Sequence, residues 1–231
     1  MTGPGLDEIE ARIVECRLCP RLVAWREDAP LHPPARFAGQ TYWARPVPGF
    51  GDPKARVLVV GLAPAAHGGN RTGRVFTGDR SGDFMFPALF ETGFANQPTS
   101  TGLGDGLELR DLFVAAVNRC APPDNKPTPQ ERDNCLPYLV AEMRELTNVR
   151  VIVCLGAFAW NGAQSALAVL GHEARPRPKF GHQAEASVDQ YTLVGSYHPS
   201  QQNTFTGKLT HQMLLDVFVR ARALAGLTAL K

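Results

Sequence analysis

The sequence predicts an α/β protein, a three-layer α/β/α sandwich around a central four-stranded parallel sheet. Two observations carry this prediction. Four short apolar runs, rich in β-branched residues, are typical of strands buried on both faces. The runs alternate with segments of helical pattern, which indicates helices that cross over from one parallel strand to the next. A chain of 231 residues suits one such domain, spanning residues 1–231.

The expected elements follow in chain order. Residues 6–25 have a helical pattern that is interrupted around Cys16–Pro20, and residues 26–52 are rich in proline and glycine, which predicts an ordered loop. Thr128, Pro129 and Glu131 match a capping box, so a helix is expected to begin there. Strands are predicted at residues 56–60, 112–117, 149–155 and 191–196, and further helices within 82–93 and over 128–146, 157–170 and 209–224.

Composition limits the classes of partner. The formal net charge is +2, so bulk charge predicts no particular partner, and a nucleic-acid-binding face would need basic residues gathered locally. No apolar run has the length of a membrane span, and the first residues are acidic and polar, unlike a signal peptide. We therefore expect a cytoplasmic protein that does not bind membranes.

Segments rich in glycine and polar residues follow the predicted strands. Gly61–Asp79 comes directly after the first strand, residues 118–125 after the second, and residues 197–203 after the fourth. Parallel strands end at one edge of a sheet, which is where α/β proteins place their binding sites. Glycine-dense backbone at that edge can approach a ligand closely. The pattern predicts a site but not its reaction.

Five cysteines in a cytosolic protein favour a metal centre or reactive thiols over disulfides. Cys154 lies in a strand pattern and is expected to be a small buried hydrophobe. The other four supply enough thiolates for either a [4Fe–4S] cluster or a tetrahedral zinc ion, and their spacing does not distinguish the two. These candidate ligands are Cys16, Cys19, Cys120 and Cys135.

Five segments together resemble the uracil-DNA glycosylase superfamily, and within it family five, the type B enzymes. They are ECRLCPRLVAWRE, YWARPVPGFGD, GLAPAAHGGNRTGRVFTGD, RCAPPDNKPTPQER and SYHPSQQNTFTGKLT. The resemblance implies a monomer that flips uracil and related deaminated or modified bases out of double-stranded or single-stranded DNA. It also implies hydrolysis of the N-glycosidic bond, and a [4Fe–4S] cluster on the four cysteines that ties the N-terminal region to the middle of the chain. No lysine occupies an evident nucleophile position, so we expect a monofunctional enzyme that leaves an abasic site.

Three residues are candidates for catalytic roles: Asn125 and His198, whose roles the resemblance implies, and Asp79, the nearest carboxylate in the loop after the first strand. An asparagine at the position of Asn125 holds the attacking water in the family, and an amide orients water without removing its proton. His198 is expected to donate to O2 of the departing base, a role for which a neutral imidazole suffices. Asp79 either assists the water or holds its loop through backbone amides, and we favour the second role.

Other residues are expected to contact the base or the DNA. Related families carry Asp, Asn or Glu at or near the position of Leu62, and the absence of such a residue here removes the obvious general base. Backbone groups of Leu62 and Ala63 are expected to contact the base, Phe76 to stack on it or to pack in the core, and His67 to contact the substrate or to cap the loop. The DNA-binding candidates, of which the basic ones could equally be solvated charges, are Arg71, Arg74, Lys126, Gln201, Gln202 and Asn203.

Two alternatives remain at this stage. The first is a family-four type uracil-DNA glycosylase of narrow specificity, against which the Leu62–Ala63 pair argues. The second is a non-catalytic iron–sulfur or zinc protein that binds nucleic acid or carries electrons. Formation of an abasic product from uracil-containing DNA distinguishes a glycosylase from a non-catalytic protein of either kind.

Overall fold

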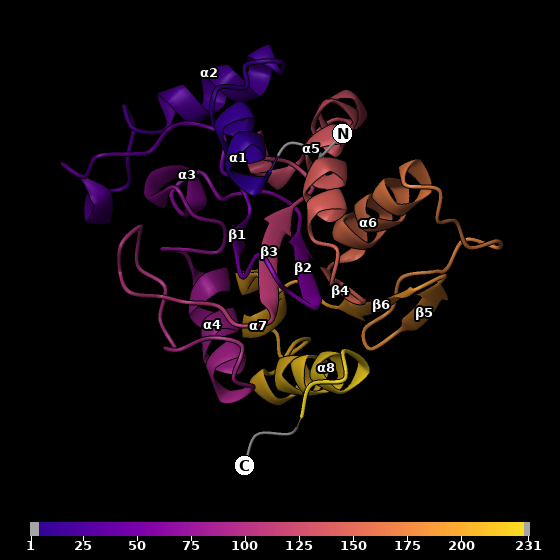
Figure 1. Cartoon of the computed structure of the whole chain (residues 1–231). Helices are drawn as coiled ribbons and strands as arrows, with labels where there is room; N and C mark the ends of the chain where they lie inside the picture. The colour runs from indigo at the N-terminus through magenta and orange to yellow at the C-terminus, as the bar shows by residue number, and fades with distance from the viewer. Residues whose placement is uncertain (1–4, 229–231) are drawn as a thin grey trace.

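A computed structural model describes residues 5–228 of the chain (Figure 1). Its centre is a six-stranded sheet in the order β1-β3-β2-β4-β6-β5. The four inner strands are parallel, as predicted, and the edge strands β1 and β5 pair antiparallel to their neighbours. The strands are β1 (Phe50–Gly51), β2 (Val57–Gly61), β3 (Leu112–Ala116), β4 (Val151–Leu155), β5 (Glu185–Val188) and β6 (Tyr191–Ser196).

The prediction of a four-stranded sheet therefore needs a correction, because the sheet has two further strands at its edges. β1 contains only two residues, and it lies at the end of the proline-rich segment. β5 has the sequence EASV, whose residues are exposed or half-buried except for the last. Neither strand carries the apolar run that marks a fully buried strand, so neither was expected from the sequence.

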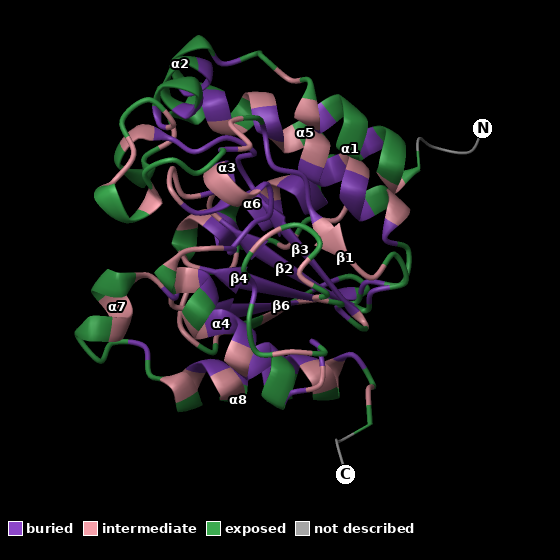
Figure 2. Cartoon of the chain, turned by 90° about the vertical axis from the view of Figure 1, so that its left-hand side faces the viewer, coloured by how far each residue is buried: buried purple, intermediate pink, exposed green. Residues whose placement is uncertain are grey.

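Helices cover both faces of the sheet, which confirms the three-layer prediction (Figure 2). All residues of β2, β3 and β4 are buried. Alternate residues face opposite layers, so Val57 and Val59 pack toward α4 and α8 while Leu58 and Val60 pack toward α5 and α6. The helices are α1 (Leu6–Val14), α2 (Pro20–Asp28), α3 (Gly69–Thr72), α4 (Arg80–Glu91), α5 (Pro129–Glu145), α6 (Ala157–Val169), α7 (Gln201–Phe205) and α8 (His211–Leu224).

Local sequence signals explain several helix ends. The first helical pattern breaks between α1 and α2, as predicted around Cys16–Pro20. The capping box before α5 is present, because Thr128 Oγ1 accepts the Glu131 N–H at 3.2 Å and the Glu131 carboxylate accepts the Thr128 N–H at 2.8 Å. The short helices α3 and α7 lie in segments that were expected to be loops.

The longest helix, α5, contains 17 residues. Within residues 5–228, no helix combines the length and the apolar character needed to cross a membrane.

Candidate active site

A cavity of about 550 Å³ lies at the carboxyl ends of the parallel strands. Three segments bound it: the glycine loop, defined here as Gly61–Asp79 between β2 and α4, the loop after β3, and the segment after β6. Phe76, Asn125 and His198 come from these three segments and all line the cavity. The structure thus brings together the side chains that were expected to meet the base. Other predicted site residues in its wall are Leu62, Ala63, Asp79, Gln201 and Gln202.

Phe76 is held in a strained backbone conformation at the cavity wall. Its φ is +53°, in the left-handed region that a bulky residue rarely adopts, and its side chain is buried. Two glycines make this geometry fit: a Cβ on Gly61 would meet the Phe76 ring, and a Cβ on Gly82 would collide with the Phe76 carbonyl oxygen. The ring therefore packs against the sheet and presents an edge or face to the cavity at one fixed place.

His198 lies beside Phe76, with their ring centroids 5.9 Å apart. Burial lowers the pKa of His198 to about 4, so the imidazole is neutral at physiological pH. Among the hydrogen bonds of the described residues, none involves the imidazole nitrogens, whereas the His198 carbonyl accepts the side-chain amide of Asn203 at 2.9 Å. The main chain is thus anchored, and the ring is left with a donor for a ligand.

Asn125 lies on the rim of the cavity in a rigid loop. Asp124 and Asn125 both have positive φ values, 54° and 55°, which Asn and Asp tolerate better than most residues. Pro122 and Pro123 precede them, and the Asn125 N–H donates to the Pro122 carbonyl at 3.2 Å. No hydrogen bond within the described chain involves the side-chain amide of Asn125. The residue is exposed, so this amide is available to a water molecule.

Asp79 caps helix α4. Its Oδ1 accepts the backbone N–H groups of Ser81 at 2.9 Å and of Gly82 at 3.1 Å. Burial raises the pKa of this carboxyl, while the two N–H groups act in the opposite direction. The geometry supports the loop-holding role that was favoured from the sequence. A Cβ on Gly68 would meet Oδ2, so the carboxylate packs closely against the middle of the glycine loop.

Leu62 and Ala63 form the inner wall of the cavity, where both are half-buried. The Leu62 carbonyl accepts the Asn118 N–H at 2.9 Å, so the turn after β2 is fastened to the end of β3. This fixes the backbone that was expected to contact the base.

His67 and Arg71 lie on the far side of the glycine loop. His67 Nδ1 is 2.9 Å from the hydroxyl of Tyr42, and burial lowers the pKa of His67, with a further contribution from Arg36 and Arg71. Arg71 donates to the His67 carbonyl, to Gln40 and to the Gly78 carbonyl, each at 2.9 Å. Both side chains hold the loop, and neither lines the base cavity.

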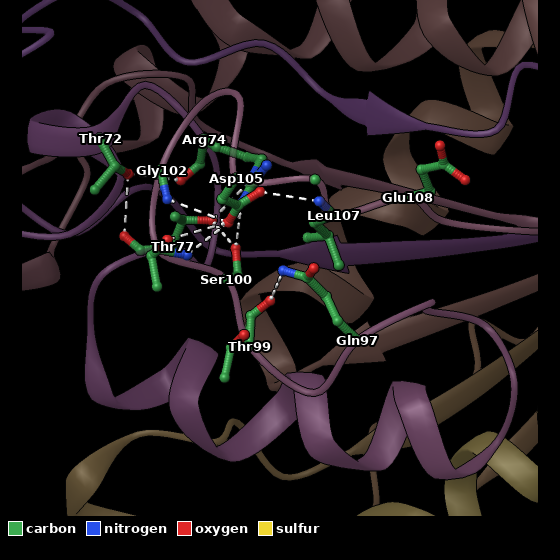
Figure 3. A network of polar contacts seen from close by, with 12 residues as sticks. Thr72, Arg74, Thr77, Gln97, Thr99, Ser100, Gly102, Asp105, Leu107 and Glu108 are labelled. Atoms are coloured by element: carbon green, nitrogen blue, oxygen red, sulfur yellow. Dashed lines mark hydrogen bonds and ion pairs between the residues drawn. The ribbon is translucent and has the colours of Figure 1, made fainter.

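Arg74 does not lie on the surface where it was expected to meet DNA. Its side chain is only 7% exposed, forms an ion pair with Asp105 and donates to Ser100 at 2.8 Å (Figure 3). Arg119, a second basic residue at the strand ends, is similarly buried and paired with Glu142. Both guanidinium groups are used inside the protein, which corrects the prediction for Arg74.

The remaining DNA-binding candidates are mostly accessible. Lys126, Gln201 and Gln202 are exposed, and α7 projects its polar residues to solvent (Figure 2). Asn203 is half-buried and uses its amide on the His198 carbonyl, so it positions the histidine. Phe205, at the end of α7, is 72% exposed.

The four candidate cysteine ligands come from three distant segments and gather at one place. Cys19 and Cys120 pack together on Leu22, and the thiol groups of Cys16, Cys19, Cys120 and Cys135 influence one another electrostatically. Burial raises the pKa of Cys120 to about 11 and that of Cys135 to about 12. All four are free thiols. Cys154, as predicted, is fully buried in β4.

A buried arginine lies beside these thiols. Arg26, 2% exposed, donates from Nη1 to Cys120 Sγ at 3.0 Å and to the Cys16 carbonyl at 3.1 Å, and its Nε has no partner in residues 5–228. The arrangement suits a negatively charged group at the thiols. No three or more His, Cys, Asp or Glu side chains in the described part of the chain are disposed to hold a single metal ion.

Sequence reasoning missed some residues of the cavity wall. Asp124 precedes Asn125 in the proline-flanked loop, and Ser81 lies close after Asp79. Their position next to predicted site residues was the available signal, but only the fold shows that they face the same cavity. The additional lining residues are Ala65, Ser81 and Asp124, and Arg80 and Ser200, from segments expected to face DNA, line it as well.

Comparison with known proteins adds an independent finding. The family model described as the uracil DNA glycosylase superfamily matches residues 48–221. A type-5 uracil-DNA glycosylase of Mycobacterium tuberculosis is 51% identical over 222 residues, covering 95% of this chain and 82% of the relative. The type-5 enzyme of Mycobacterium leprae is 50% identical over 228 residues, 97% and 98% of the two chains. The type-5 enzyme of Thermus thermophilus is 50% identical over 216 residues, which cover 93% of this chain and 96% of the relative.

Proposed function

This chain belongs to the uracil-DNA glycosylase superfamily, as its sequence motifs predicted, and we propose that it is a monofunctional DNA N-glycosylase of the type-5 kind. It removes uracil from DNA by hydrolysing the bond between the base and its deoxyribose. The observation that carries the proposal is the single cavity lined by Phe76, Asn125 and His198. None of the described residues that line it is a lysine, which supports simple hydrolysis over strand scission through an amine.

The cavity receives the extruded base. A volume of about 550 Å³, open at the strand ends, accommodates a nucleobase together with its sugar. Phe76 gives the base a stacking surface, worth about 1–3 kcal/mol in comparable sites. Leu62 and Ala63 form the inner wall and offer backbone groups to the edge of the base. Stacking depends weakly on base identity, so the site is expected to accept other deaminated bases as well.

His198 stabilises the departing base. As the glycosidic bond breaks, negative charge develops on the base, and a fixed donor aimed at its O2 lowers the barrier. With a pKa of about 4, His198 is a neutral imidazole that keeps one N–H for this purpose. The phenyl ring of Phe76 and the Asn203 bond to its main chain fix the orientation of the histidine.

Asn125 positions the attacking water. Its amide oxygen accepts a hydrogen bond from water and directs it to the sugar carbon that loses the base. An amide does not take the proton, so the water attacks late, after the bond to the base has largely broken. This mechanism depends on a good leaving group, which uracil is when His198 stabilises its charge.

The four cysteines are proposed to hold a [4Fe–4S] cluster. The alternative left open by the sequence, a single zinc ion, has no support from the arrangement of side chains in the described residues. Four thiolates suit such a cluster, and the buried cation of Arg26 supports a negatively charged group beside Cys120. When bound, the cluster supplies a structural cross-link, because hydrolysis of a glycosidic bond transfers no electrons. It would join the connection between α1 and α2, the segment after β3, and α5. Iron and acid-labile sulfide in the purified protein, or zinc in their place, decide between the two.

Uracil-containing duplex DNA tests the activity. Incubation with the purified protein, followed by alkaline cleavage at abasic sites, is expected to cut the strand at the former uracil. His198→Ala is expected to lower the single-turnover rate about 10²–10³-fold and Asn125→Ala by a smaller factor, with DNA affinity nearly unchanged. An exposed control, Val219→Ala on α8, should leave the rate as it is. Unchanged cleavage in both site variants would remove the proposed roles.

Two further outcomes address the alternatives. A non-catalytic binding protein would retain DNA without forming any abasic product. A narrow type-4 activity would release uracil but not hypoxanthine or ethenocytosine from matched duplexes. Stacking on Phe76 depends weakly on base identity, so we expect release of more than one base.

A further inference from the structure

A second cavity, of about 310 Å³, adjoins the base cavity. Its outer wall comes from Trp25 on α2, from Arg36 in the turn Ala35–Phe37, and from His67 on the glycine loop. Because the two cavities share a wall, a ligand that fills the first can extend into the second. The shared residues are Ala65, Asp79, Arg80, Asp124, Asn125 and Gln201.

Trp25 differs from the other two tryptophans of the chain. The indole N–H groups of Trp43 and Trp160 donate to the carbonyls of Pro46 and Pro178, at 3.0 and 2.9 Å. The Trp25 N–H has no such partner in the described chain, and its side chain is 38% exposed. A large aromatic surface is therefore open at the edge of a polar cavity, where a planar ligand can stack on it.

Two arginines of this cavity retain their hydrogen-bonding capacity. Arg36 and Arg80 are exposed and form neither a hydrogen bond nor an ion pair with other described residues. By contrast, Arg71 in the glycine loop donates hydrogen bonds within the protein from Nε and from both terminal nitrogens. The Arg36 guanidinium is partly oriented by the Phe37 ring, whose centroid is 4.7 Å from Cζ.

Charge divides the second cavity into two parts. The wall shared with the base cavity carries charges of both signs, the carboxylates of Asp79 and Asp124 and the guanidinium of Arg80. The outer wall carries Arg36 beside Trp25. A phosphate group is attracted by the outer wall, where no carboxylate among the lining residues opposes Arg36. An aromatic surface beside a free guanidinium is a combination that binds a base and its phosphate.

We propose that this second cavity is a subsite for the nucleotide next to the lesion in the same DNA strand. Its base stacks on Trp25, and its phosphate faces Arg36. The proposal rests on the proposed uracil excision and adds a statement on the substrate, namely that recognition extends over at least two consecutive nucleotides. Stacking tolerates any base, so the subsite increases affinity without imposing a sequence preference.

The test uses single-stranded oligonucleotides with one uracil, in which the neighbouring nucleotide on either side carries a base or is abasic. For the wild-type protein, loss of the neighbouring base on one side is expected to raise KM about tenfold, with kcat unchanged. Trp25→Ala should raise KM by a similar factor on the intact oligonucleotide and show no further loss on the abasic one. Trp25→Phe, which keeps an aromatic ring, should retain most of the affinity.

Two further variants complete the design. Phe90→Ala removes an exposed aromatic of α4 outside both cavities and is expected to behave as wild type on every oligonucleotide. Arg36→Ala is expected to raise KM on all of them and to reduce the slope of log KM against log salt by about one. The proposal would be overturned if removal of the neighbouring base, on either side of the lesion, raised KM by the same factor in the wild type and in Trp25→Ala.

Failure of the underlying activity gives a different result. If the wild-type protein released no uracil from any oligonucleotide, the proposed function would fail. The proposed subsite is then tested by binding affinity alone, measured by fluorescence polarisation with the same oligonucleotides. Affinity that depends on both Trp25 and the neighbouring base supports it, and affinity independent of either overturns it.

Discussion

The glycine loop and the segment from Ser200 to Thr206 line the same cavity but are built in contrasting ways. In the glycine loop, Val75, Phe76 and Thr77 are buried. The carbonyls of Arg71 and Asn70 accept the backbone N–H groups of Trp43 and Ala44, at 3.0 and 2.9 Å. The second segment exposes most of its side chains, including Phe205. One wall is fixed before substrate arrives, and the other presents polar side chains to solvent.

This difference separates two tasks. A stacking surface such as the Phe76 ring acts only if it is already in place when the bond breaks, and a buried, hydrogen-bonded loop provides that. Contact with DNA needs accessible side chains and tolerates mobility. Substitutions in the glycine loop should therefore affect folding and catalysis together, whereas substitutions of the exposed α7 residues Gln201 and Gln202 should affect DNA affinity alone.

The largest effect is expected for Gly82→Ala. The added Cβ collides with the Phe76 carbonyl oxygen, which is main chain and has no freedom to rotate away. We expect a loss of about 1–3 kcal/mol in the free energy of unfolding, together with slower cleavage. Urea denaturation measures the first and single-turnover assays the second. Gly102→Ala, where a Cβ meets nothing within 4 Å, is the matched control. Equal stability of the two variants would contradict the account of Phe76.

Replacement of Asp79 separates its two suggested roles. Asp79→Ala removes the cap of α4 and is expected to cost about 1 kcal/mol of stability. Asp79→Asn keeps an oxygen for the same two N–H groups and should restore both stability and cleavage. A stable Asn variant that no longer cleaves would instead show that the carboxylate acts on water.

A smaller effect is expected in α7. Gln201→Ala and Gln202→Ala, alone or combined, should weaken binding to uracil-containing duplex a few-fold, because each loses about one hydrogen bond of about 1 kcal/mol. Their unfolding midpoints should equal that of the wild type, since both side chains are exposed. A drop in stability without a change in affinity would reverse the assignment of this wall.

The smallest effect is expected from pH. His198 has a pKa of about 4 in the folded protein, so its neutral fraction hardly changes between about pH 8 and pH 5. The single-turnover rate should be flat there, and a tenfold fall per unit below about pH 6.5 would contradict a neutral donor. In the unfolded chain histidine titrates near 6.5. The contribution of His198 to stability is therefore complete above that pH and is lost as pH falls toward 4.

The sequence was sufficient for the parallel strands and the cavity-forming segments, because each buried strand carries an uninterrupted apolar run. It was insufficient where tertiary contacts decide. Arg74 and Lys126 carry the same charge and lie in the loops that follow two neighbouring strands. Arg74 is buried, where it contacts Asp105 and Ser100, whereas Lys126 is exposed. No local pattern reveals a partner about thirty residues away. Edge strand β5 was missed for a related reason, since its half-exposed residues resemble a loop.

The arrangement of the base in the cavity is tested most directly by a crystal structure of the protein with duplex DNA that carries an uncleavable 2′-fluorinated deoxyuridine. We predict that the uracil is outside the helix, with its ring against Phe76, its O2 within hydrogen-bond distance of a His198 ring nitrogen, and a water between Asn125 and the sugar. A uracil that remains stacked in the duplex, or one bound away from these three side chains, would contradict the account.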